Sequence, residues 1–261
     1  MNTVNDYLKS GAIDIAPLLS LALNKTTTEL YTQGGYQLST EETKQLENLI
    51  KQREQGVPFS YLSGTKGFYH LDFKVTSDTL IPRPETELII DIALDLLDKQ
   101  KSYDIVDLGT GSGIIAVTLA DKCPKWNLTA TDYSYAALEV AKTNATTNIN
   151  FQQGRWFDAT PNQCFDLIIS NPPYIEQGDP YLYDLTYEPQ SALVSGKDGL
   201  DDIRIIVNIA PKYLNQDGYL LLEHGYNQQD IIEELLSDQF QNIQRFKDFN
   251  GQDRAILAQI K

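Results

Sequence analysis

The sequence predicts an α/β protein with a mostly parallel sheet and helices on both faces, preceded by a small helical domain. From about residue 84, patterns typical of buried strands alternate with amphipathic helical stripes, which indicates parallel strands joined by crossover helices. The preceding residues lack this alternation, and a glycine-rich turn directly joins a predicted strand to a predicted helix. We expect a helical domain over residues 1–75, a hairpin and linker over 76–87, and the α/β domain over 88–261.

The N-terminal part carries clear helix signals. Apolar residues crowd positions 18–23. A capping box at 39–42 begins a helix with apolar residues at helical spacing, and Gly56 and Pro58 end it. Residues 68–76 have the pattern of an extended hairpin strand.

Strand and helix patterns follow one another through the rest of the chain. We expect helices over 88–97, 114–120, 136–144, 200–213 and 231–236, strands over 103–108, 128–131, 165–170 and 219–223, and strand-like runs around Ile243 and Ile256. In sheets of this kind, ligands bind beyond the carboxyl ends of the strands. The residues that carry chemistry should therefore lie in the turns that follow the strands.

Composition excludes several classes of protein. Hydrophobic residues make up 41% of the 261 residues, enough for a packed core. No apolar run approaches the ~20 residues of a membrane span, and residues 1–6 lack the pattern of a secretory signal, so we expect a soluble cytoplasmic protein. The two cysteines, Cys123 and Cys164, and the two histidines, His70 and His224, are too few for a disulfide framework or a His/Cys zinc cage.

The net charge bears on the choice of partner. The chain has 21 Lys and Arg residues against 36 Asp and Glu residues, a formal charge of −15. The excess of acid is spread along the chain, and neither half has the composition of a phosphate-binding surface. We therefore expect no direct nucleic-acid partner and no membrane partner.

The glycine turn after the strand at 103–108 is a candidate ligand site. It consists of Gly109, Thr110, Gly111, Ser112 and Gly113. Glycines permit positive φ and a close approach of the backbone to a ligand, and the helix behind them offers free N–H groups. The G-x-G-x-G spacing is neither the dinucleotide fingerprint nor a phosphate loop. With Asp107 at its mouth and no cation nearby, the turn suits a zwitterionic or cationic ligand; the alternative is a tight turn without a ligand.

Asp132 ends the next predicted strand, about 20 residues after the last glycine, where an acidic residue commonly accepts hydrogen bonds from ribose hydroxyls. The alternative is that it caps the following helix, a task that Ser134 can also perform. Binding and capping are compatible, and we favour binding.

Asn171, Pro172, Pro173 and Tyr174 follow the strand at 165–170. The prolines fix φ and leave their carbonyls as acceptors only, and Asn171 adds a side-chain carbonyl. Rigid acceptors beside an aromatic ring suit a planar NH₂ group. The alternative is an ordinary surface loop, which the position after a buried strand argues against.

Together these motifs resemble a known family. The glycine turn with Asp132 resembles the cofactor site of class I S-adenosylmethionine-dependent methyltransferases, and Asn-Pro-Pro-Tyr resembles the motif of adenine-N6 and glutamine-N5 methyltransferases. Five further pieces are similar to the release factor glutamine methyltransferases, at 56–64, 80–87, 188–189, 198–200 and 222–225. The resemblance runs from about residue 50 to the C-terminus, and departs from the family's pattern at Asp217, where a glycine is expected.

The resemblance implies a Rossmann-like domain with a seven-stranded sheet that transfers a methyl group from S-adenosylmethionine to the glutamine side chain of the Gly-Gly-Gln motif in peptide chain release factors. It implies that the glycine turn, Asp132, Asn171 and Trp156 bind the cofactor, with Trp156 beside the adenine ring unless it is a core residue. The residues expected to hold or act on the substrate are Asn171, Pro172, Pro173 and Tyr174. We assign no role to Arg83, Glu85 and Glu87, and expect both histidines to be structural. We also expect a monomer.

The nearest alternative is adenine-N6 methylation of DNA or RNA. No Lys or Arg lies between Arg155 and Lys197, while six acidic residues do, and phosphates would face these carboxylates. A nucleotide-dependent oxidoreductase would need the G-x-G-x-x-G turn that is missing. A non-catalytic binding module does not account for Asn-Pro-Pro-Tyr. The sequence therefore favours a protein substrate.

Overall fold

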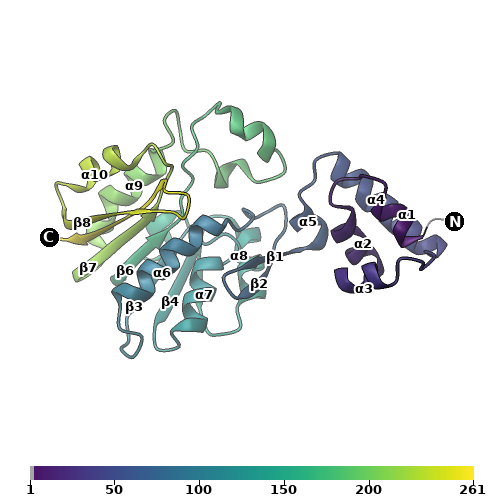
Figure 1. Cartoon of the computed structure of the whole chain (residues 1–261). Helices are drawn as coiled ribbons and strands as arrows, with labels where there is room; N and C mark the ends of the chain where they lie inside the picture. Colours follow the sequence, from purple (N-terminus) through teal and green to yellow (C-terminus); the bar gives the residue numbers. More distant parts are fainter. Residues whose placement is uncertain (1–2) are drawn as a thin grey trace. The chain divides into compact units, whose positions relative to one another are not determined.

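The computed structural model describes residues 3–261, and the chain divides into two compact units, one ending at Thr65 and one comprising Lys66–Lys261 (Figure 1). The first unit is helical, with α1 (Val4–Leu8), α2 (Ile15–Leu23), α3 (Thr27–Thr32), α4 (Thr40–Glu54) and α5 (Phe59–Ser63). Helix α4 begins at the expected capping box, where the Ser39 hydroxyl accepts from the Glu42 amide over 3.2 Å and the Glu42 carboxylate accepts from the Ser39 amide over 2.7 Å. The apolar residues of 18–23 form much of this unit's core.

A two-stranded hairpin, β1 (Thr65–Phe68) and β2 (Leu71–Lys74), follows the helices. Phe68 and Phe73 are buried in a core shared with helices of the second unit. The first compact unit therefore ends at Thr65, whereas the expected helical domain extends to residue 75, because the hairpin packs with the residues that follow it.

The second unit is built on a seven-stranded sheet in the order β5-β4-β3-β6-β7-β9-β8, which confirms the predicted mostly parallel sheet. Its strands are β3 (Asp104–Leu108), β4 (Asn127–Asp132), β5 (Asn150–Gln153), β6 (Phe165–Ser170), β7 (Leu214–Glu223), β8 (Phe240–Lys247) and β9 (Asp253–Ile260). Strands β5, β4, β3, β6 and β7 are parallel, and β9 runs antiparallel to both of its neighbours. From β3 the chain adds strands in one direction and from β6 in the other, so a crevice forms between their carboxyl ends.

Helices cover both faces of this sheet (Figure 1). They are α6 (Glu87–Leu96), α7 (Ile114–Lys122), α8 (Tyr135–Asn144), α9 (Asp201–Ile209) and α10 (Gln229–Leu236). Successive strand residues point to opposite faces, so Ile105 belongs to the core under α6 and α7 while Val106 belongs to the core under α9 and α10. The helix expected over 200–213 changes at Ala210 to a short 3₁₀ turn, because Pro211 cannot donate a backbone hydrogen bond.

Within residues 3–261, no helix combines the length and the apolar character that a bilayer span requires. No three His, Cys, Asp or Glu side chains of this described part gather as a possible metal site. Cys123 is buried and Cys164 is exposed, and both are free thiols.

Candidate functional site

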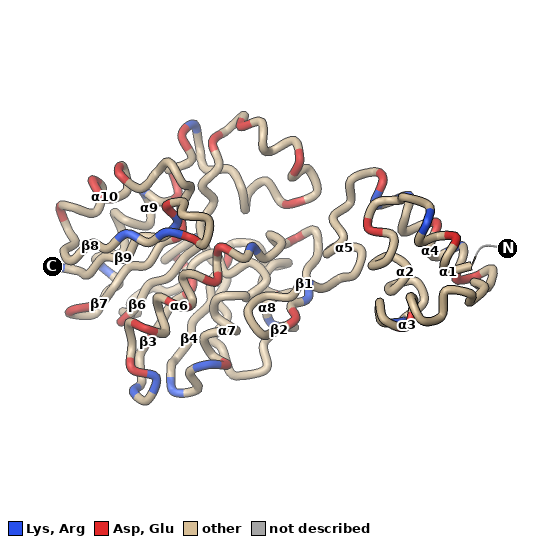
Figure 2. The backbone as a smooth tube through the Cα atoms, in the orientation of Figure 1, with Lys and Arg blue, Asp and Glu red and all other residues tan. Residues whose placement is uncertain are grey.

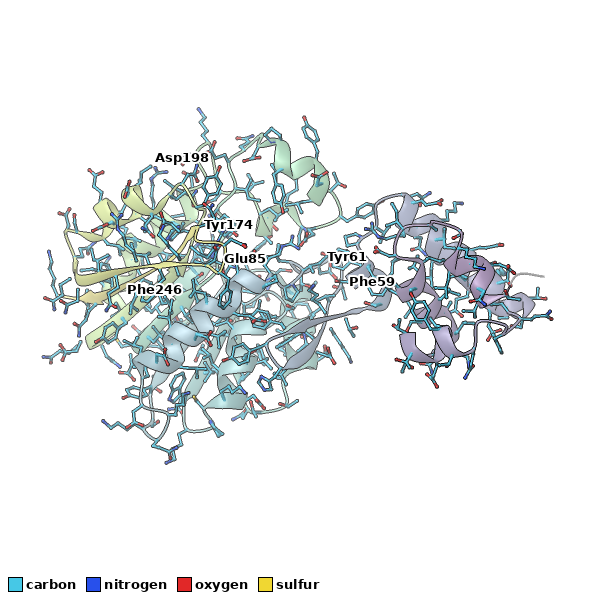
Figure 3. All side chains as sticks on the ribbon, in the orientation of Figure 1. Phe59, Tyr61, Glu85, Tyr174, Asp198 and Phe246 are labelled. Atoms are coloured by element: carbon cyan, nitrogen blue, oxygen red, sulfur yellow. The ribbon has the colours of Figure 1, made fainter. Side chains whose placement is uncertain are left out.

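Two cavities lie beyond the carboxyl ends of the parallel strands, the first beside the turns after β3 and β4 and the second beside the segments after β6 and β7. The first has a volume of about 580 Å³ and is lined by residues 109–112 of the glycine turn, Asp132 and Trp156. The second has a volume of about 470 Å³ and is lined by Tyr174 and Glu85, both labelled in Figure 3, and by Arg254. Leu80, Asn171 and Ala192 line both cavities. A molecule in one cavity would therefore meet a molecule in the other beside Asn171.

The glycine turn has the backbone conformation that its sequence predicts. Gly109, Gly111 and Gly113 have φ values of 73°, 56° and 87°, which side-chain-bearing residues rarely adopt. The amides of Gly109 and Thr110 both donate to the Thr131 carbonyl over 2.9 Å, which closes the turn against β4. A Cβ on Gly111 would meet nothing within 4 Å, so the backbone there faces open space in the cavity.

Gly113, unlike the other four residues of the glycine turn, does not line the first cavity. It is the N-cap residue of α7, and a Cβ there would lie 3.1 Å from the Ala141 Cβ and 3.2 Å from Val117 Cγ2. The glycine at this position therefore allows α7 to pack closely against α8.

Asp107 lies beneath the glycine turn and not at its mouth, which corrects the expectation from sequence. It is fully buried and absent from the lining of either cavity. Its Oδ2 accepts hydrogen bonds from the Thr110 hydroxyl over 2.6 Å and the Ala116 amide over 3.3 Å, while Oδ1 has no partner among residues 3–261. Burial raises the pKa of Asp107 to about 7, although the two hydrogen bonds act to lower it. The carboxyl ties the turn to α7.

Asp132 joins the glycine turn to the end of β4. Its Oδ2 accepts from the Gly111 amide over 3.0 Å and its Oδ1 accepts from the Ser134 amide over 2.8 Å. Ser134 is the residue that caps α8, through its hydroxyl and the Ala137 amide. Burial raises the pKa of Asp132, and the backbone hydrogen bonds oppose this. A carboxylate has about four acceptor positions, so Asp132 retains capacity to accept from a ligand in the first cavity that it lines.

Trp156 lies across the glycine turn and lines the first cavity. Its backbone has a φ of 48°, a conformation that costs of the order of 1 kcal/mol for a residue of this kind. A Cβ on Gly109 would lie 3.2 Å from Trp156 Cζ3, so a side chain there would press against the ring. The indole packs partly on the apolar core, and its buried Nε1 has no partner within the described chain. The side chain thus belongs to both the core and the cavity wall.

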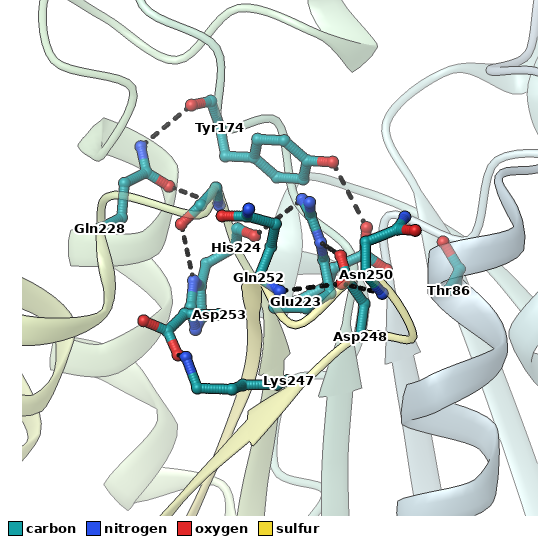
Figure 4. A network of polar contacts seen from close by, with 12 residues as sticks. Thr86, Tyr174, Glu223, His224, Gln228, Lys247, Asp248, Asn250, Gln252 and Asp253 are labelled. Carbon is teal, nitrogen blue, oxygen red and sulfur yellow. Dashed lines mark hydrogen bonds and ion pairs between the residues drawn. The ribbon is translucent and has the colours of Figure 1, made fainter.

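The Asn-Pro-Pro-Tyr turn follows β6 and separates the two cavities. Pro173 lines the first, Pro172 and Tyr174 line the second, and Asn171 lines both. The Asn171 Nδ2 donates to the Thr86 hydroxyl oxygen over 3.1 Å. The Tyr174 hydroxyl donates to Glu223 Oε1 over 3.4 Å (Figure 4). Asn171 therefore lies at the junction of the two cavities.

Three residues without a role assigned from sequence lie against this turn: Thr86 at Asn171, and Gln228 and Gly199 at Tyr174. Gln228 Nε2 donates to the Tyr174 carbonyl over 3.0 Å, as Figure 4 shows. A Cβ on Gly199 would lie 2.2 Å from the same carbonyl oxygen, and the φ of Gly199 is 73°. Thr86 and Gly199 lie in the segments 80–87 and 198–200, which resemble the family, so the resemblance could have indicated them. No sequence motif indicated Gln228. Each of these partners is distant in sequence from the motif it supports.

Glu223 is the last residue of β7 and His224 follows it, and both are fully buried. Burial raises the pKa of Glu223 to about 7, although hydrogen bonding from Thr86 and the positive charge of Arg254 act to lower it. Burial lowers the pKa of His224, whose Nδ1 lies 2.9 Å from the Gly225 carbonyl oxygen. His224 lines neither cavity, in keeping with its expected structural role.

The linker before α6 is tied to the segment after the Asn-Pro-Pro-Tyr turn. Arg83 forms an ion pair with the nearly buried Glu188, whose other carboxylate oxygen accepts from the Ile81 amide over 2.9 Å. Residues on both sides of this contact line the first cavity, among them Leu80 and Pro189. Arg83 therefore helps to hold together two segments of the cavity wall.

The sequence matches two family models and is similar to several named proteins. Residues 89–188 match the family described as methyltransferase small domain, and residues 6–64 match the PrmC N-terminal domain. The release factor glutamine methyltransferase of Coxiella burnetii is 41% identical over 96% of this chain and 92% of its own length. That of Vibrio cholerae is 42% identical over 97% of this chain and 91% of its own length.

Solved structures share the architecture at lower identity. A methyltransferase from Pyrococcus furiosus matches 81% of this chain and 98% of its own, with a TM-score of 0.57 and 19% identity. The Thermus thermophilus 16S rRNA N2 G1207 methyltransferase, solved with AdoMet and guanosine, matches 76% of this chain and 50% of its own, with a TM-score of 0.56 and 18% identity. The likeness confirms the expected Rossmann-like class I methyltransferase fold of the α/β unit.

Proposed function

Because the chain belongs to the family of release factor glutamine methyltransferases, we propose that it methylates the side-chain amide nitrogen, N5, of the glutamine in the Gly-Gly-Gln motif of peptide chain release factors. The family membership rests on relatives 38–44% identical over most of the chain. The methyl donor is S-adenosylmethionine, and the modification would modulate translation termination. The observation that carries the chemistry is the position of Asn171 in the walls of both cavities.

The first cavity fits the cofactor on three structural grounds. The backbone of Gly111 faces open space, the indole of Trp156 offers a flat surface, and Asp132 retains acceptor capacity for hydroxyl groups. S-adenosylmethionine supplies an electrophilic methyl group on a sulfonium centre. We propose that the residues that hold it are those of its expected set that line the cavity: Gly109, Thr110, Gly111, Ser112, Asp132, Trp156 and Asn171.

The chain's own contribution is to hold a poor nucleophile in a reactive position. An amide nitrogen shares its lone pair with the carbonyl, and the related peptide rotation barrier is ~18–20 kcal/mol. The Asn171 side-chain oxygen and the Pro172 carbonyl would each accept one N–H of the substrate amide, which directs the remaining face of the nitrogen toward the first cavity. These hydrogen bonds strengthen as the nitrogen gains positive charge, and so favour the transition state.

Tyr174 would complete the substrate position from the second cavity, whose wall it forms. Its hydroxyl contacts Glu223 Oε1 over 3.4 Å, which orients the ring. Burial raises the pKa of Tyr174, which keeps the phenol protonated. No strong base is required, because a methylated cationic amide loses its proton readily.

Charge supports a protein substrate over adenine in DNA or RNA. Residues 156–196 contain no Lys or Arg, and acidic residues lie along this segment in Figure 2. Arg83 and Arg254 line the second cavity, but each is paired, with Glu188 and Asp248. Phosphates would meet a surface without free cations in this segment, whereas a basic protein would find complementary charge.

The proposed function also bears on the role of the helical first unit, the oligomeric state and the location of the protein. We propose that the helical first unit, which matches the PrmC N-terminal domain, contributes to recognition of the release factor. We also propose that the protein is a monomer. We propose that it works in the cytoplasm, because its proposed substrates act on ribosomes there.

The decisive experiment incubates the protein with labelled S-adenosylmethionine and a mixture of release factor and adenine-containing DNA. Mass spectrometry should locate the label on the glutamine of Gly-Gly-Gln. A release factor with this glutamine changed to alanine is the control and should stay unlabelled. Label on adenine, or elsewhere on the protein, would overturn the proposal.

A further inference from the structure

Behind Asn171 lies a buried group of polar side chains, of which Thr86 and Glu223 line neither cavity. Asn171 Nδ2 donates to the hydroxyl oxygen of Thr86, and Thr86 is fully buried at the start of α6. Hydrogen bonding from the Thr86 side chain also lowers the pKa of Glu223, at the end of β7, so the Thr86 hydroxyl lies close to this carboxyl. Figure 4 shows Thr86 and Glu223 together, with Tyr174 contacting the same carboxyl.

The direction of the hydrogen bonds in this group follows from the number of protons available. A threonine hydroxyl has one proton, and an ionised carboxylate can only accept. When Thr86 donates to Glu223, its oxygen can only accept from Asn171. Tyr174 also donates to Glu223, so both neighbours treat the carboxyl as an acceptor. Glu223 Oε2 has no hydrogen-bond partner within residues 3–261, and Arg254 contributes a positive charge nearby.

The orientation of the Asn171 amide matters for the reaction. The carbonyl oxygen and the NH₂ group of asparagine are nearly equal in size, so shape does not distinguish the two orientations and hydrogen bonding must. With the NH₂ group committed to Thr86, the carbonyl oxygen is the group left to face the cavities that Asn171 lines. In the reverse orientation, N–H groups of Asn171 and of a substrate amide would face each other without an acceptor.

We infer that Thr86 and Glu223 are positioning residues that fix the Asn171 side chain with its carbonyl oxygen toward the substrate. This inference rests on the proposed function, because it assigns these residues a task in holding the glutamine amide. If the role of Thr86 were purely structural, its side chain would only pack at the start of α6 and would not orient Asn171. The two roles differ in whether the effect of Thr86 depends on Asn171.

A double-mutant cycle separates them. Thr86→Val keeps the shape and removes the hydroxyl, and Thr86→Ser keeps the hydroxyl. We expect Thr86→Val to lower kcat about tenfold or more, the effect of one lost hydrogen bond, with the calorimetric affinity for S-adenosylmethionine unchanged. Thr86→Ser should restore most of the turnover. In the Asn171→Ala background, Thr86→Val should have no further effect.

Equal losses from Thr86→Val in both backgrounds would overturn the inference, as would full activity of Thr86→Val. If Thr86→Val also lowers stability, the double-mutant cycle still separates the two roles, because a folding defect lowers turnover in both backgrounds. A wild-type protein that fails to methylate the release factor would instead contradict the proposed function. The two failures are therefore distinguishable.

Discussion

The Asp132 carboxylate accepts a hydrogen bond from the Gly111 amide over 3.0 Å, and so joins the end of β4 to the glycine turn after β3. A second carboxylate oxygen accepts from the Ser134 amide. Both neighbours lie in the wall of the first cavity, as does Asp132 itself. One side chain therefore shapes the turn and presents acceptor positions to whatever occupies the cavity.

Replacing this carboxylate should weaken cofactor binding. Asp132→Ala removes the brace on Gly111 and the acceptor for ligand hydroxyls, so we expect affinity for S-adenosylmethionine to fall at least ~10-fold, the scale of one or two hydrogen bonds. Isothermal titration calorimetry measures this directly. Asp132→Asn keeps one acceptor oxygen and should show a smaller loss. Normal affinity for S-adenosylmethionine in Asp132→Ala would show that Asp132 only stabilises the turn and does not bind the cofactor.

Asn171→Ala should separate binding from turnover. The side chain lines both cavities but the glycine turn, Asp132 and Trp156 remain, so we expect cofactor affinity to stay nearly unchanged. Turnover should fall at least ~10²-fold, as when one well-placed polar group is removed from a transition state. Single-turnover kinetics with a release factor, beside calorimetry, tests both parts. Unchanged turnover would remove the residue from its proposed role.

Much of the fold was predictable because hydrophobic periodicity reports burial. Helix α7 and strands β3 and β6 bury nearly all their residues, and their sequence patterns are unambiguous. Strand β5 (Asn150–Gln153) gave no such signal, because it is a short edge strand with no fully buried residue. Where half-exposed polar residues form a strand, the partner strand determines the conformation.

The site was predictable in location but less so in its contacts. Parallel strands bring their carboxyl ends together, so the turns at Gly109 and Asn171 had to be neighbours. Strand pleating determines that Asp107 points beneath the turn, and no local pattern distinguishes this from a place at its mouth. Thr86 and Gln228 reach the Asn-Pro-Pro-Tyr turn from distant parts of the chain, so only the tertiary fold shows the contacts.

Gly199→Ala should destabilise the protein more than its backbone conformation alone explains. A Cβ would lie 2.2 Å from the Tyr174 carbonyl oxygen, in addition to the strain at a φ of 73°. Gly178 is a matched control, since its φ is 88° and a Cβ there meets nothing within 4 Å. We expect Gly178→Ala to cost about 1 kcal/mol and Gly199→Ala clearly more, by denaturant unfolding. Equal losses would show that the contact with Tyr174 is not tight.

Asp107 should make stability depend on pH. Burial raises the pKa of this carboxyl in the folded protein to about 7 from the model-compound value of 3.8. Between these values the folded state binds the proton that the unfolded state releases, so the Asp107 contribution falls as pH rises, by up to ~1.4 kcal/mol per pH unit. Asp107→Asn cannot ionise, so its stability relative to wild type should improve from about pH 5 to about pH 8. A pH-independent difference in unfolding free energy would contradict the buried, uncharged carboxyl.

Glu223 should make turnover depend on pH through Thr86. Burial raises its pKa to about 7, with Thr86, Arg254 and Tyr174 lowering it and Glu85 raising it. Ionised Glu223 can only accept from Thr86, whereas the protonated carboxyl can donate and so permit the reversed Asn171 amide. We expect kcat, at saturating cofactor, to fall as pH drops below about 7.

Two variants identify the titrating group. Glu223→Gln cannot ionise and should lose the inflection in the pH profile between about pH 6 and pH 8. Asp107→Asn removes the other carboxyl with a pKa of about 7 and should keep the inflection, because Asp107 bonds to Thr110 and Ala116 and not to Thr86. If the inflection survives in Glu223→Gln, or disappears in Asp107→Asn, then Glu223 does not set the orientation of Asn171 by its charge. If it follows Glu223 alone, a buried carboxyl outside both cavities controls the acceptor at their junction.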